Sequence, residues 1–412
     1  MNLDEITLRS PRADEVRQFL EPVSAAFAEE FSDGEIDVER ALMEPDRFIN
    51  AFRGEDRVGS AGAYSFRLSV PGGEIGSAGI TAVGVRPDQR RRGIMRRMMT
   101  WLLDDARQRG EPVAILTASQ AAIYQRFGFG QGTIQSSFTA EAGRLDFREP
   151  IGDDPARRIR IVDANEAARI FPVVYEAFRR DQPGAVTRSE AKWQTQLLAD
   201  PEWMRAGGGP KYRALLEVDG EPRGYAIYRI KSEWSPSGPN SVLNAIEVTG
   251  LDPVVEQTLW QWLLSIDLVG TVRTYRHPVP HPLQHWLLEP RRLGLTVGDG
   301  LWLRLLDVPA ALAGRRYAGS GTVVLELTDA LIESNAGRWQ VTVEDGQATV
   351  ERTAAPPDLS LDVAALASVY LGAFRFGDLA RAGRVAECLP GALLTVDSLF
   401  TPTRAPWCST PF

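Results

Sequence analysis

Residues 83–129 constrain most strongly what this chain can fold into. Residues 83–86 alternate like a short strand that ends at Pro87, and beyond a basic turn the apolar residues of 94–107 recur at helical spacing. A helix start can bind an anion, because its first N–H groups lack intrahelical partners and carry the positive end of the helix dipole. Gly93 permits close backbone approach, and the arginines around it add charge-assisted contacts. We therefore expect a phosphate group to bind at this turn.

A second predicted strand, 112–118, leads into a short helix that ends in I-Y-Q-R-F-G-F at 123–129. The succession of strand, R-x-x-G turn, helix, strand and Y-x-R-F-G-F helix end resembles the core of the GNAT acyl-CoA-dependent N-acetyltransferases. The resemblance implies two parallel strands that splay apart, with the pantetheine arm of the cofactor between them. One position departs from the pattern: Met95 stands where the family often has Gly or Ala, which narrows the approach to the turn.

The arginines of the turn have two other readings. Arg90, Arg91, Arg92, Arg96 and Arg97 could form a solvated charged face or a nucleic-acid patch. Binding to a phosphate backbone requires a broad basic surface, whereas this chain has a net charge of −8 and a pI near 5.2. We therefore expect no nucleic-acid partner.

Bulk composition bounds the class of protein. A chain of 412 residues predicts two or three domains, and a hydrophobic content of 44% is ordinary for a globular protein. No apolar run reaches the ~18–20 residues of a membrane span, and the acidic N-terminus does not resemble a signal peptide. Cys388 and Cys408 are too few for a disulfide framework. We expect a cytoplasmic protein without a membrane partner, whose acidic balance suits a cationic substrate.

The fold class expected is α/β (α+β), in three domains. Residues 1–150 form the first. Residues 151–299 repeat its order, with a strand at 242–248, a helix at 254–265 and a strand at 270–275. The connection at 249–253 has no arginine, and Asp252 would repel a phosphate. We expect a degenerate GNAT-like domain without a cofactor site, which serves as a cleft wall or an assembly surface.

Residues 300–412 form the third expected domain. A hairpin joins 339–343 to 347–352, and a strand at 359–363 precedes a helix at 364–374. This pattern resembles the sterol-carrier-like domain. The chain ends in a proline-containing tail with Trp407 and Phe412, which predicts an extended segment fixed by two aromatic side chains.

Two other groups of residues raise functional questions. His277, His281 and His285 are spaced by four, but the prolines between them forbid a helix, so we expect no metal site. Glu29 and Glu30 could attract an amine, or they could be surface charges on a helix.

The whole layout resembles the enhanced intracellular survival (Eis) family of acetyltransferases. The resemblance rests on four motifs: R-R-R-G-I at 90–94, I-Y-Q-R-F-G-F at 123–129, L-W-L-R-L-L-D-V-P-A-A-L at 301–312 and a C-terminal Phe412. The resemblance implies acetyl transfer from acetyl-CoA to amines of aminoglycosides, often at several positions, or of lysines, by a homohexamer. In that family the carboxylate of the last residue, a phenylalanine, points back into the cleft of the first domain.

The resemblance also implies roles for individual residues. The Phe412 carboxylate would accept the proton of the substrate ammonium, and Tyr124 would protonate the departing thiolate. The N–H of Val85 would polarise the thioester carbonyl. The cofactor-binding residues implied are Val83, Gly84, Val85, Arg91, Arg92, Gly93, Ile94, Met95, Arg96, Ser119 and Gln120.

Other interpretations stay open. Tyr124 could only pack its helix on the sheet, and Phe412 could be a hydrophobic contact with an incidental carboxylate. Pro411 could fix the approach of the tail or displace it. The protein could be a nonenzymatic acetyl-CoA-binding scaffold, or a lipid-binding protein that acts through its third domain.

Overall fold

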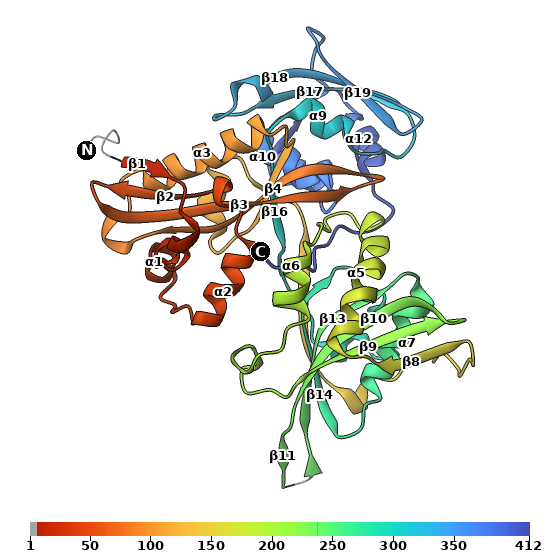
Figure 1. The fold of residues 1–412 in the computed structure, drawn as a ribbon. Coiled ribbons are helices and arrows are strands. Elements are labelled where there is room, and N and C mark those ends of the chain that lie inside the picture. Colours follow the sequence, from red (N-terminus) through yellow and green to blue (C-terminus); the bar gives the residue numbers. More distant parts are fainter. Residues whose placement is uncertain (1–5, 237) are drawn as a thin grey trace. The chain divides into compact units, whose positions relative to one another are not determined.

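The computed structural model describes residues 6–236 and 238–412 (Figure 1). It divides into two compact units. Unit 1 takes the chain as far as Thr133, then Gly300–Pro406 and Thr410–Phe412. Unit 2 comprises Ile134–Asp299 and Trp407–Ser409.

The main sheet of unit 1 has 7 strands in the order β1-β2-β3-β4-β5-β16-β6. Neighbouring strands are antiparallel, except that β4 and β5 are parallel. The strands are β1 (Ile6–Arg9), β2 (Phe48–Arg53), β3 (Asp56–Val70), β4 (Gly73–Val85), β5 (Val113–Thr117), β16 (Leu301–Leu305) and β6 (Gly130–Gln131). The helices before residue 133 are α1 (Val16–Phe27), α2 (Asp33–Leu42), α3 (Ile94–Gln108) and α4 (Ala121–Gln125).

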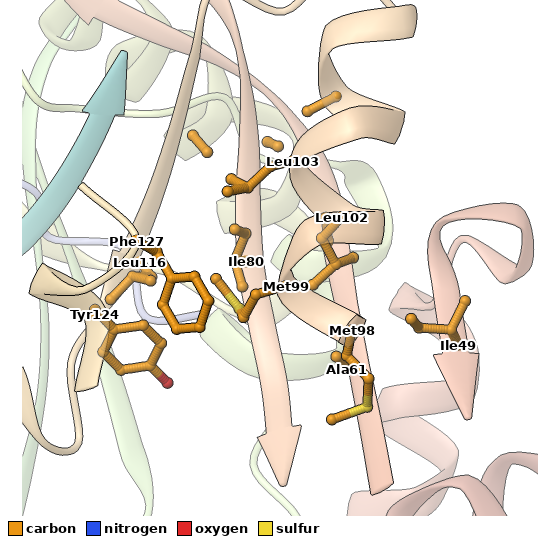
Figure 2. Close-up of a cluster of buried hydrophobic side chains, with 14 of the residues drawn as sticks. Ile49, Ala61, Ile80, Met98, Met99, Leu102, Leu103, Leu116, Tyr124 and Phe127 are labelled. Carbon is orange, nitrogen blue, oxygen red and sulfur yellow. The ribbon is translucent and has the colours of Figure 1, made fainter. Parts of the chain in front are cut away.

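Helices α1 and α3 cover opposite faces of this sheet (Figure 1). The predicted helix at 94–107 is confirmed as α3, which buries Met98, Met99 and Leu102 against β2, β3 and β4 (Figure 2). Helix α1 packs on β3 and β4 and buries Phe19 and Leu20. Burial of one apolar stripe per helix is what fixes both helices to the sheet.

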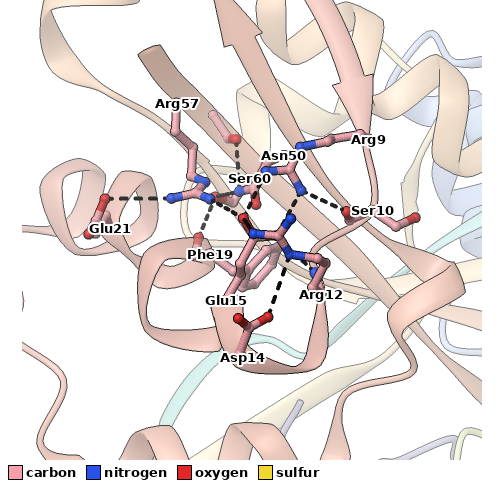
Figure 3. A network of polar contacts seen from close by, with 11 residues as sticks. Arg9, Ser10, Arg12, Asp14, Glu15, Phe19, Glu21, Asn50, Arg57 and Ser60 are labelled. Atoms are coloured by element: carbon pink, nitrogen blue, oxygen red, sulfur yellow. Dashed lines mark hydrogen bonds and ion pairs between the residues drawn. The ribbon is translucent and has the colours of Figure 1, made fainter. Parts of the chain in front are cut away.

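A polar network joins the start of α1 to the edge of the sheet (Figure 3). The Glu15 carboxylate accepts hydrogen bonds from Arg9 at 2.7 and 2.8 Å, from the Arg12 backbone N–H at 2.9 Å and from Arg57 at 3.4 Å. The Arg9 hydrogen bonds and the Arg12 N–H lower the pKa of Glu15 to about 2. The network therefore fixes α1 relative to β1 and β3 at neutral pH.

The main sheet of unit 2 repeats this architecture. It also has 7 strands, in the order β15-β7-β14-β13-β10-β9-β8, with β13 and β14 parallel. The strands are β8 (Arg157–Ile161), β9 (Lys211–Val218), β10 (Glu221–Lys231), β13 (Ser241–Gly250), β14 (Val269–Pro278), β7 (Ile134–Glu141) and β15 (Thr296–Asp299). The helices are α5 (Ala164–Arg180), α6 (Glu190–Lys192), α7 (Pro253–Leu264) and α8 (Leu283–Trp286), and a hairpin joins β11 (Trp234–Ser235) to β12 (Gly238–Pro239).

The two units divide the chain at other places than the domains expected at 1–150, 151–299 and 300–412, because β7 belongs to the second sheet and β16 to the first. Strand β7 follows the first unit in sequence but pairs with β14 and β15 in the second sheet. Strand β16 follows the second unit but pairs with β5 and β6 in the first. Sequence order alone does not show the pairing of β16, because its partners β5 and β6 lie far from it along the chain.

A second sheet, of 5 strands, completes unit 1 in the order β19-β18-β17-β20-β21. Its strands are β17 (Gly321–Thr328), β18 (Gly337–Glu344), β19 (Gln347–Arg352), β20 (Leu359–Asp362) and β21 (Val385–Glu387), with α9 (Val308–Ala313), α10 (Val363–Tyr370), α11 (Phe376–Arg381) and α12 (Ala392–Phe400). The predicted hairpin is confirmed as β18 and β19. The helix expected at 364–374 ends at Tyr370, and each of its residues is buried.

Across the described residues, every helix is too short or too polar to cross a bilayer.

Candidate active site

The turn before α3 has the backbone of an anion-binding site. Arg91 and Gly93 both adopt positive φ values, 62° and 79°. Gly93 is the N-cap of α3, and no side chain caps that end of the helix. Left-handed residues in such a turn bring successive N–H groups to one side, and the helix dipole adds positive potential there. The geometry suits a phosphate, as the sequence predicts.

The arginines of this turn differ in their exposure and in their hydrogen bonds. Arg90 donates a hydrogen bond to the carbonyl of Ala26 at 3.0 Å, which ties the turn to the end of α1. Arg91 and Arg96 are exposed, and Arg92 is half-buried. The exposed guanidinium groups add positive charge beside the helix start, and they are available to a diphosphate as bidentate donors.

Strands β4 and β5 separate just before this turn. They pair in parallel only from Ser77 to Gly79 on β4 and from Val113 to Ile115 on β5. Beyond Gly79, β4 pairs only with β3, and a register shift there places an extra residue in β4 next to Ala82, whose φ is 50°. A bulge of this kind bends the strand and increases its twist. Residues 83–85 therefore leave the neighbouring strand and present a backbone edge to an extended ligand.

The C-terminal residue, Phe412, lies against β3 and beside Gly79 of β4. The Phe412 ring packs edge-on against Phe66 of β3, with 5.0 Å between ring centroids. This contact ends a row of aromatic contacts, hereafter the aromatic row, which runs through Phe19, Phe48, Tyr64, Phe66 and Phe412.

Two glycines make room for the aromatic row. A Cβ at Gly62 would overlap the Phe48 ring, and a Cβ at Gly79 would overlap the Phe66 ring and lie 3.4 Å from Phe412. Gly79 is also the last residue of β4 that pairs with β5. The chain terminus is therefore placed at the point where the two strands separate.

A side-chain carboxylate lies close to the aromatic row. The Tyr64 hydroxyl donates to Glu39 of α2, at 3.0 and 3.2 Å from the two carboxylate oxygens. Burial, with the nearby Glu39 charge, raises the pKa of Tyr64 well above its ordinary value, so the hydroxyl keeps its proton. Negative charge therefore accompanies the chain terminus on this face of the sheet.

Tyr124 lies at the end of the short helix α4, at the edge of the core beneath α3. Figure 2 shows its ring beside Phe127 and Leu116, and it packs edge-on against Phe129. Burial raises the pKa of Tyr124, and a hydrogen bond with Ser119 partly offsets this effect. The phenol is thus protonated at neutral pH, as a proton donor must be.

Comparison with known proteins identifies the family. Acetyltransferase (GNAT) domain families match residues 7–132 and 184–305, and the sterol carrier protein domain family matches residues 308–409. An N-acetyltransferase of Streptomyces avermitilis is 39% identical over 89% of this chain and 90% of its own length. N-acetyltransferase Eis of Mycobacterium tuberculosis is 33% identical over 96% of each chain. This chain belongs to the Eis family of GNAT N-acetyltransferases.

Solved structures agree with this assignment. The crystal structure of Eis1 from Mycobacterium abscessus is 32% identical, with a TM-score of 0.85 over 98% of this chain and 100% of that one. A GCN5-related N-acetyltransferase from Anabaena variabilis, at 21% identity and a TM-score of 0.85, shares the fold. The protein is an N-acetyltransferase with two GNAT folds and a sterol-carrier-like part, as expected from its sequence.

GNAT acetyltransferases use acetyl-CoA, and unit 1 has a place that fits it. The uncapped start of α3 offers N–H donors to the diphosphate. The unpaired edge of β4 at residues 83–85 suits the extended pantetheine arm. Val83, Met95 and Ile123 are partly buried against the core cluster that contains Tyr124.

The corresponding helix of unit 2 has a different start. The Asp252 carboxylate caps α7 by accepting a hydrogen bond from the Val255 N–H at 2.9 Å. A helix end that already has an anionic cap offers little to a phosphate. The start of α7 therefore differs from the uncapped start of α3.

Sequence reasoning missed several residues of the site. Phe66 and Gly79, which contact Phe412, were not singled out, and neither was Glu39, which hydrogen-bonds Tyr64 of the aromatic row. A period-two alternation at Tyr64 and Phe66 was visible in the sequence, but it did not show which side chain would receive the tail. Glu29 and Glu30 are both exposed.

The three histidines have different surroundings. His277 and His281 stack with centroids 3.7 Å apart, and His281 Nε2 lies 2.9 Å from a Glu256 oxygen, while His285 is exposed. Among the residues that the structure describes, no group of three His, Cys, Asp or Glu side chains could hold a metal ion.

Proposed function

We propose that this enzyme transfers an acetyl group from acetyl-CoA to primary amines of cationic substrates. Compounds of the aminoglycoside type, modified at one or several amines, and lysine side chains are the substrate classes expected. The observation that carries the proposal is the position of Phe412, against Gly79 at the point where β4 and β5 separate.

A proton acceptor is required at this point. An ammonium has no lone pair, so it must lose a proton before its nitrogen can attack the thioester. The carboxylate of Phe412 is covalently fixed to a ring that packs on Phe66. In this role it would take the proton directly or through one water. Its charge and that of Glu39 would also favour a cationic amine over a neutral one.

Two groups would act on the thioester. A backbone N–H of residues 83–85, that of Val85 in our proposal, would donate to the carbonyl oxygen as negative charge develops there. As the new C–N bond forms and the C–S bond breaks, Tyr124 would give its proton to the departing sulfur. The residues proposed to bind the cofactor remain Val83, Gly84, Val85, Arg91, Arg92, Gly93, Ile94, Met95, Arg96, Ser119 and Gln120.

An assay of free-thiol release tests the proposal. The enzyme is incubated with acetyl-CoA and, separately, tobramycin, a lysine peptide and a neutral amide. We expect release with the amines alone, and a mass increase that reports how many sites are acetylated. Release no faster than background with every amine, despite measurable acetyl-CoA binding, would favour a nonenzymatic scaffold. A lipid that copurifies with the protein would instead support the lipid-binding alternative.

The oligomeric state is part of the proposal. We propose a homohexamer, on the strength of the family resemblance. Light scattering coupled to gel filtration should give a mass near six copies of the 45.4-kDa chain. A monomeric mass for the active enzyme would contradict it.

A further inference from the structure

Unit 2 contains a buried arginine that binds the C-terminal tail. The Arg188 side chain is 0% exposed and Glu247 is 3% exposed. Arg188 donates to both Glu247 oxygens, at 2.9 and 2.7 Å, and its Nη2 also donates to the Ser409 hydroxyl at 2.9 Å. Its guanidinium lies 3.7 Å from the centroid of the Tyr175 ring. The Arg188 guanidinium therefore binds both the Glu247 carboxylate and Ser409 of the tail.

The surroundings fix this arginine in place. The Trp193 ring also faces the guanidinium, at 5.0 Å, and the Tyr225 hydroxyl donates to Glu247. Burial opposes the charge on Arg188, but the Glu247 carboxylate outweighs it and holds the pKa of Arg188 above its ordinary value. A bidentate ion pair between aromatic rings has few alternative geometries, so the donor to Ser409 is rigidly placed.

Trp407 supplies two further attachments to unit 2. Its backbone N–H donates to the carbonyl of Pro183 at 2.8 Å, and its indole Nε1–H donates to the carbonyl of Arg276 at 2.7 Å. A Cβ at Gly184, whose φ is 91°, would lie 3.0 Å from the Trp407 backbone. The absence of a side chain at Gly184 thus lets the Trp407 backbone pack closely. Residues 407–409 are hydrogen-bonded to unit 2 through both Trp407 and Ser409.

Glu247 occupies the place on β13 that corresponds to the proposed cofactor site on β4 of unit 1. Strands β13 and β14 pair in parallel only as far as Ala245 and Thr274, and a register shift follows before Glu247. Glu247 therefore lies where β13 leaves its parallel neighbour. In unit 1 the equivalent part of β4 forms the proposed acetyl-CoA site. In unit 2 the helix that follows, α7, has its N-terminus capped by Asp252.

We propose that the second GNAT fold is a docking site for the enzyme's own C-terminal segment, in which Arg188 is a positioning residue for the terminal carboxylate. The proposal rests on the proposed function, because it assigns that carboxylate a catalytic role. Three residue steps separate Ser409 from Phe412, which span at most about 10 Å. Attachment of 407–409 therefore restricts where the last residue can be.

Variants on the tail test this without disturbing the core of unit 2. Trp407→Phe removes the indole donor and keeps an aromatic ring, and Ser409→Ala removes the acceptor of Arg188. Thr403→Ala, at an exposed tail position, is the matched control. For the double variant we expect a roughly 10- to 100-fold lower kcat, the loss typical of a misplaced catalytic group. The KM for acetyl-CoA should match that of the control, whereas the Tm should be somewhat lower, because the carbonyl of Arg276 loses its donor.

A second readout reports on the tail independently of turnover. Carboxypeptidase Y removes C-terminal residues that are free to leave the protein surface, and intact mass spectrometry measures the loss of Phe412. We expect the double variant to lose Phe412 roughly tenfold faster than wild type, and Thr403→Ala to match wild type. Arg188→Lys, which keeps the charge but not the fork, should lie between them in both readouts.

Deletion of Phe412 separates the possible outcomes. If deletion abolishes turnover while the double variant keeps wild-type kcat and slow release of Phe412, the docking proposal is overturned and the proposed function stands. If deletion itself leaves turnover unchanged, the catalytic role of the carboxylate fails, and the positioning role of Arg188 fails with it.

Discussion

At the scale of single residues, the site depends on where charge and protons are held. Burial raises the pKa of Tyr124 and so keeps its hydroxyl protonated, whereas hydrogen bonds lower the pKa of Glu15 to about 2 and so keep its carboxylate ionised. These two groups show opposite consequences of environment: burial favours the neutral phenol, whereas cationic donors favour the charged carboxylate. The first consequence serves the proposed chemistry, and the second stabilises the helix that carries Phe19 of the aromatic row.

Replacement of Tyr124 tests the proton donor. Tyr124→Phe keeps the ring that packs on Phe129 and removes only the hydroxyl. We expect kcat to fall roughly 10²- to 10⁴-fold, the range typical of general acid catalysis, with acetyl-CoA affinity and Tm retained. Thiol release and calorimetric titration measure the two quantities. A wild-type kcat would limit the hydroxyl to packing.

The buried histidines predict how stability depends on pH. Burial lowers the pKa of His281 to about 3 and that of His277 well below its ordinary value. The unfolded chain binds these protons near pH 6.5, whereas the folded chain does not. The free energy of unfolding should therefore fall as pH drops from 6.5 toward 3, by up to about 1.4 kcal/mol per pH unit for each histidine.

Urea unfolding between pH 7.5 and 4.5 measures this dependence. His277→Phe should reduce the slope, and replacement of the exposed His285 by Gln is the matched control. An equal slope in wild type and His277→Phe would assign the acid sensitivity to other groups.

At the scale of elements, β4 carries the greatest part of the site. Its residues 77–79 pair with β5, the chain bulges at Ala82 beyond them, and Gly79 leaves room for the rings of Phe66 and Phe412. The sequence predicted the strand, the phosphate turn and α3, because apolar spacing and Gly93 are local signals. It could not predict the aromatic row, which depends on contacts between β2, β3 and the chain terminus.

The Gly79→Ala substitution on β4 tests whether the position of Phe412 in the aromatic row matters for turnover. Gly79→Ala would force the Phe66 ring aside and crowd Phe412, and overpacking of this kind costs about 1–3 kcal/mol of stability. We expect a lower kcat with little change in acetyl-CoA affinity. Gly76→Ala is the matched control on the same strand, because its Cβ would meet only Glu111 at 3.6 Å. Equal kinetics for the two variants would argue against a role for the Phe412 position.

At the scale of the whole molecule, the third part of the chain contributes a strand to the first sheet, because β16 pairs with β5 and β6. The expected boundaries at 150 and 299 followed composition and motif order, which identified the repeat of strand, helix and strand. The structure places β7 in the second sheet and β16 in the first, and pairing partners distant in sequence leave no periodic signal. The sterol-carrier-like part is continuous with unit 1 through β16, where Arg304 forms a buried ion pair with Asp329 at 2.7 Å.

Truncation tests the part that β16 has in the first sheet. A protein that ends at residue 299 lacks β16, so β5 and β6 lose their shared partner and the edge of the first sheet is left open. We expect the amides of β5 to exchange with solvent at the rate of an unfolded segment, measured by hydrogen exchange and mass spectrometry. Protection of these amides at the full-length level would mean that unit 1 folds without the third part of the chain.

The most direct test of the central claim replaces one atom of the chain terminus. Cys408 allows native chemical ligation of a synthetic Cys408–Phe412 peptide to the rest of the protein, with either a carboxylate or a carboxamide at Phe412. Both products keep the Phe412 ring and differ only in the proton acceptor. We predict that the carboxamide enzyme binds acetyl-CoA normally and loses kcat by roughly 10²- to 10⁴-fold relative to the ligated carboxylate enzyme. Equal kcat for the two products would contradict the account.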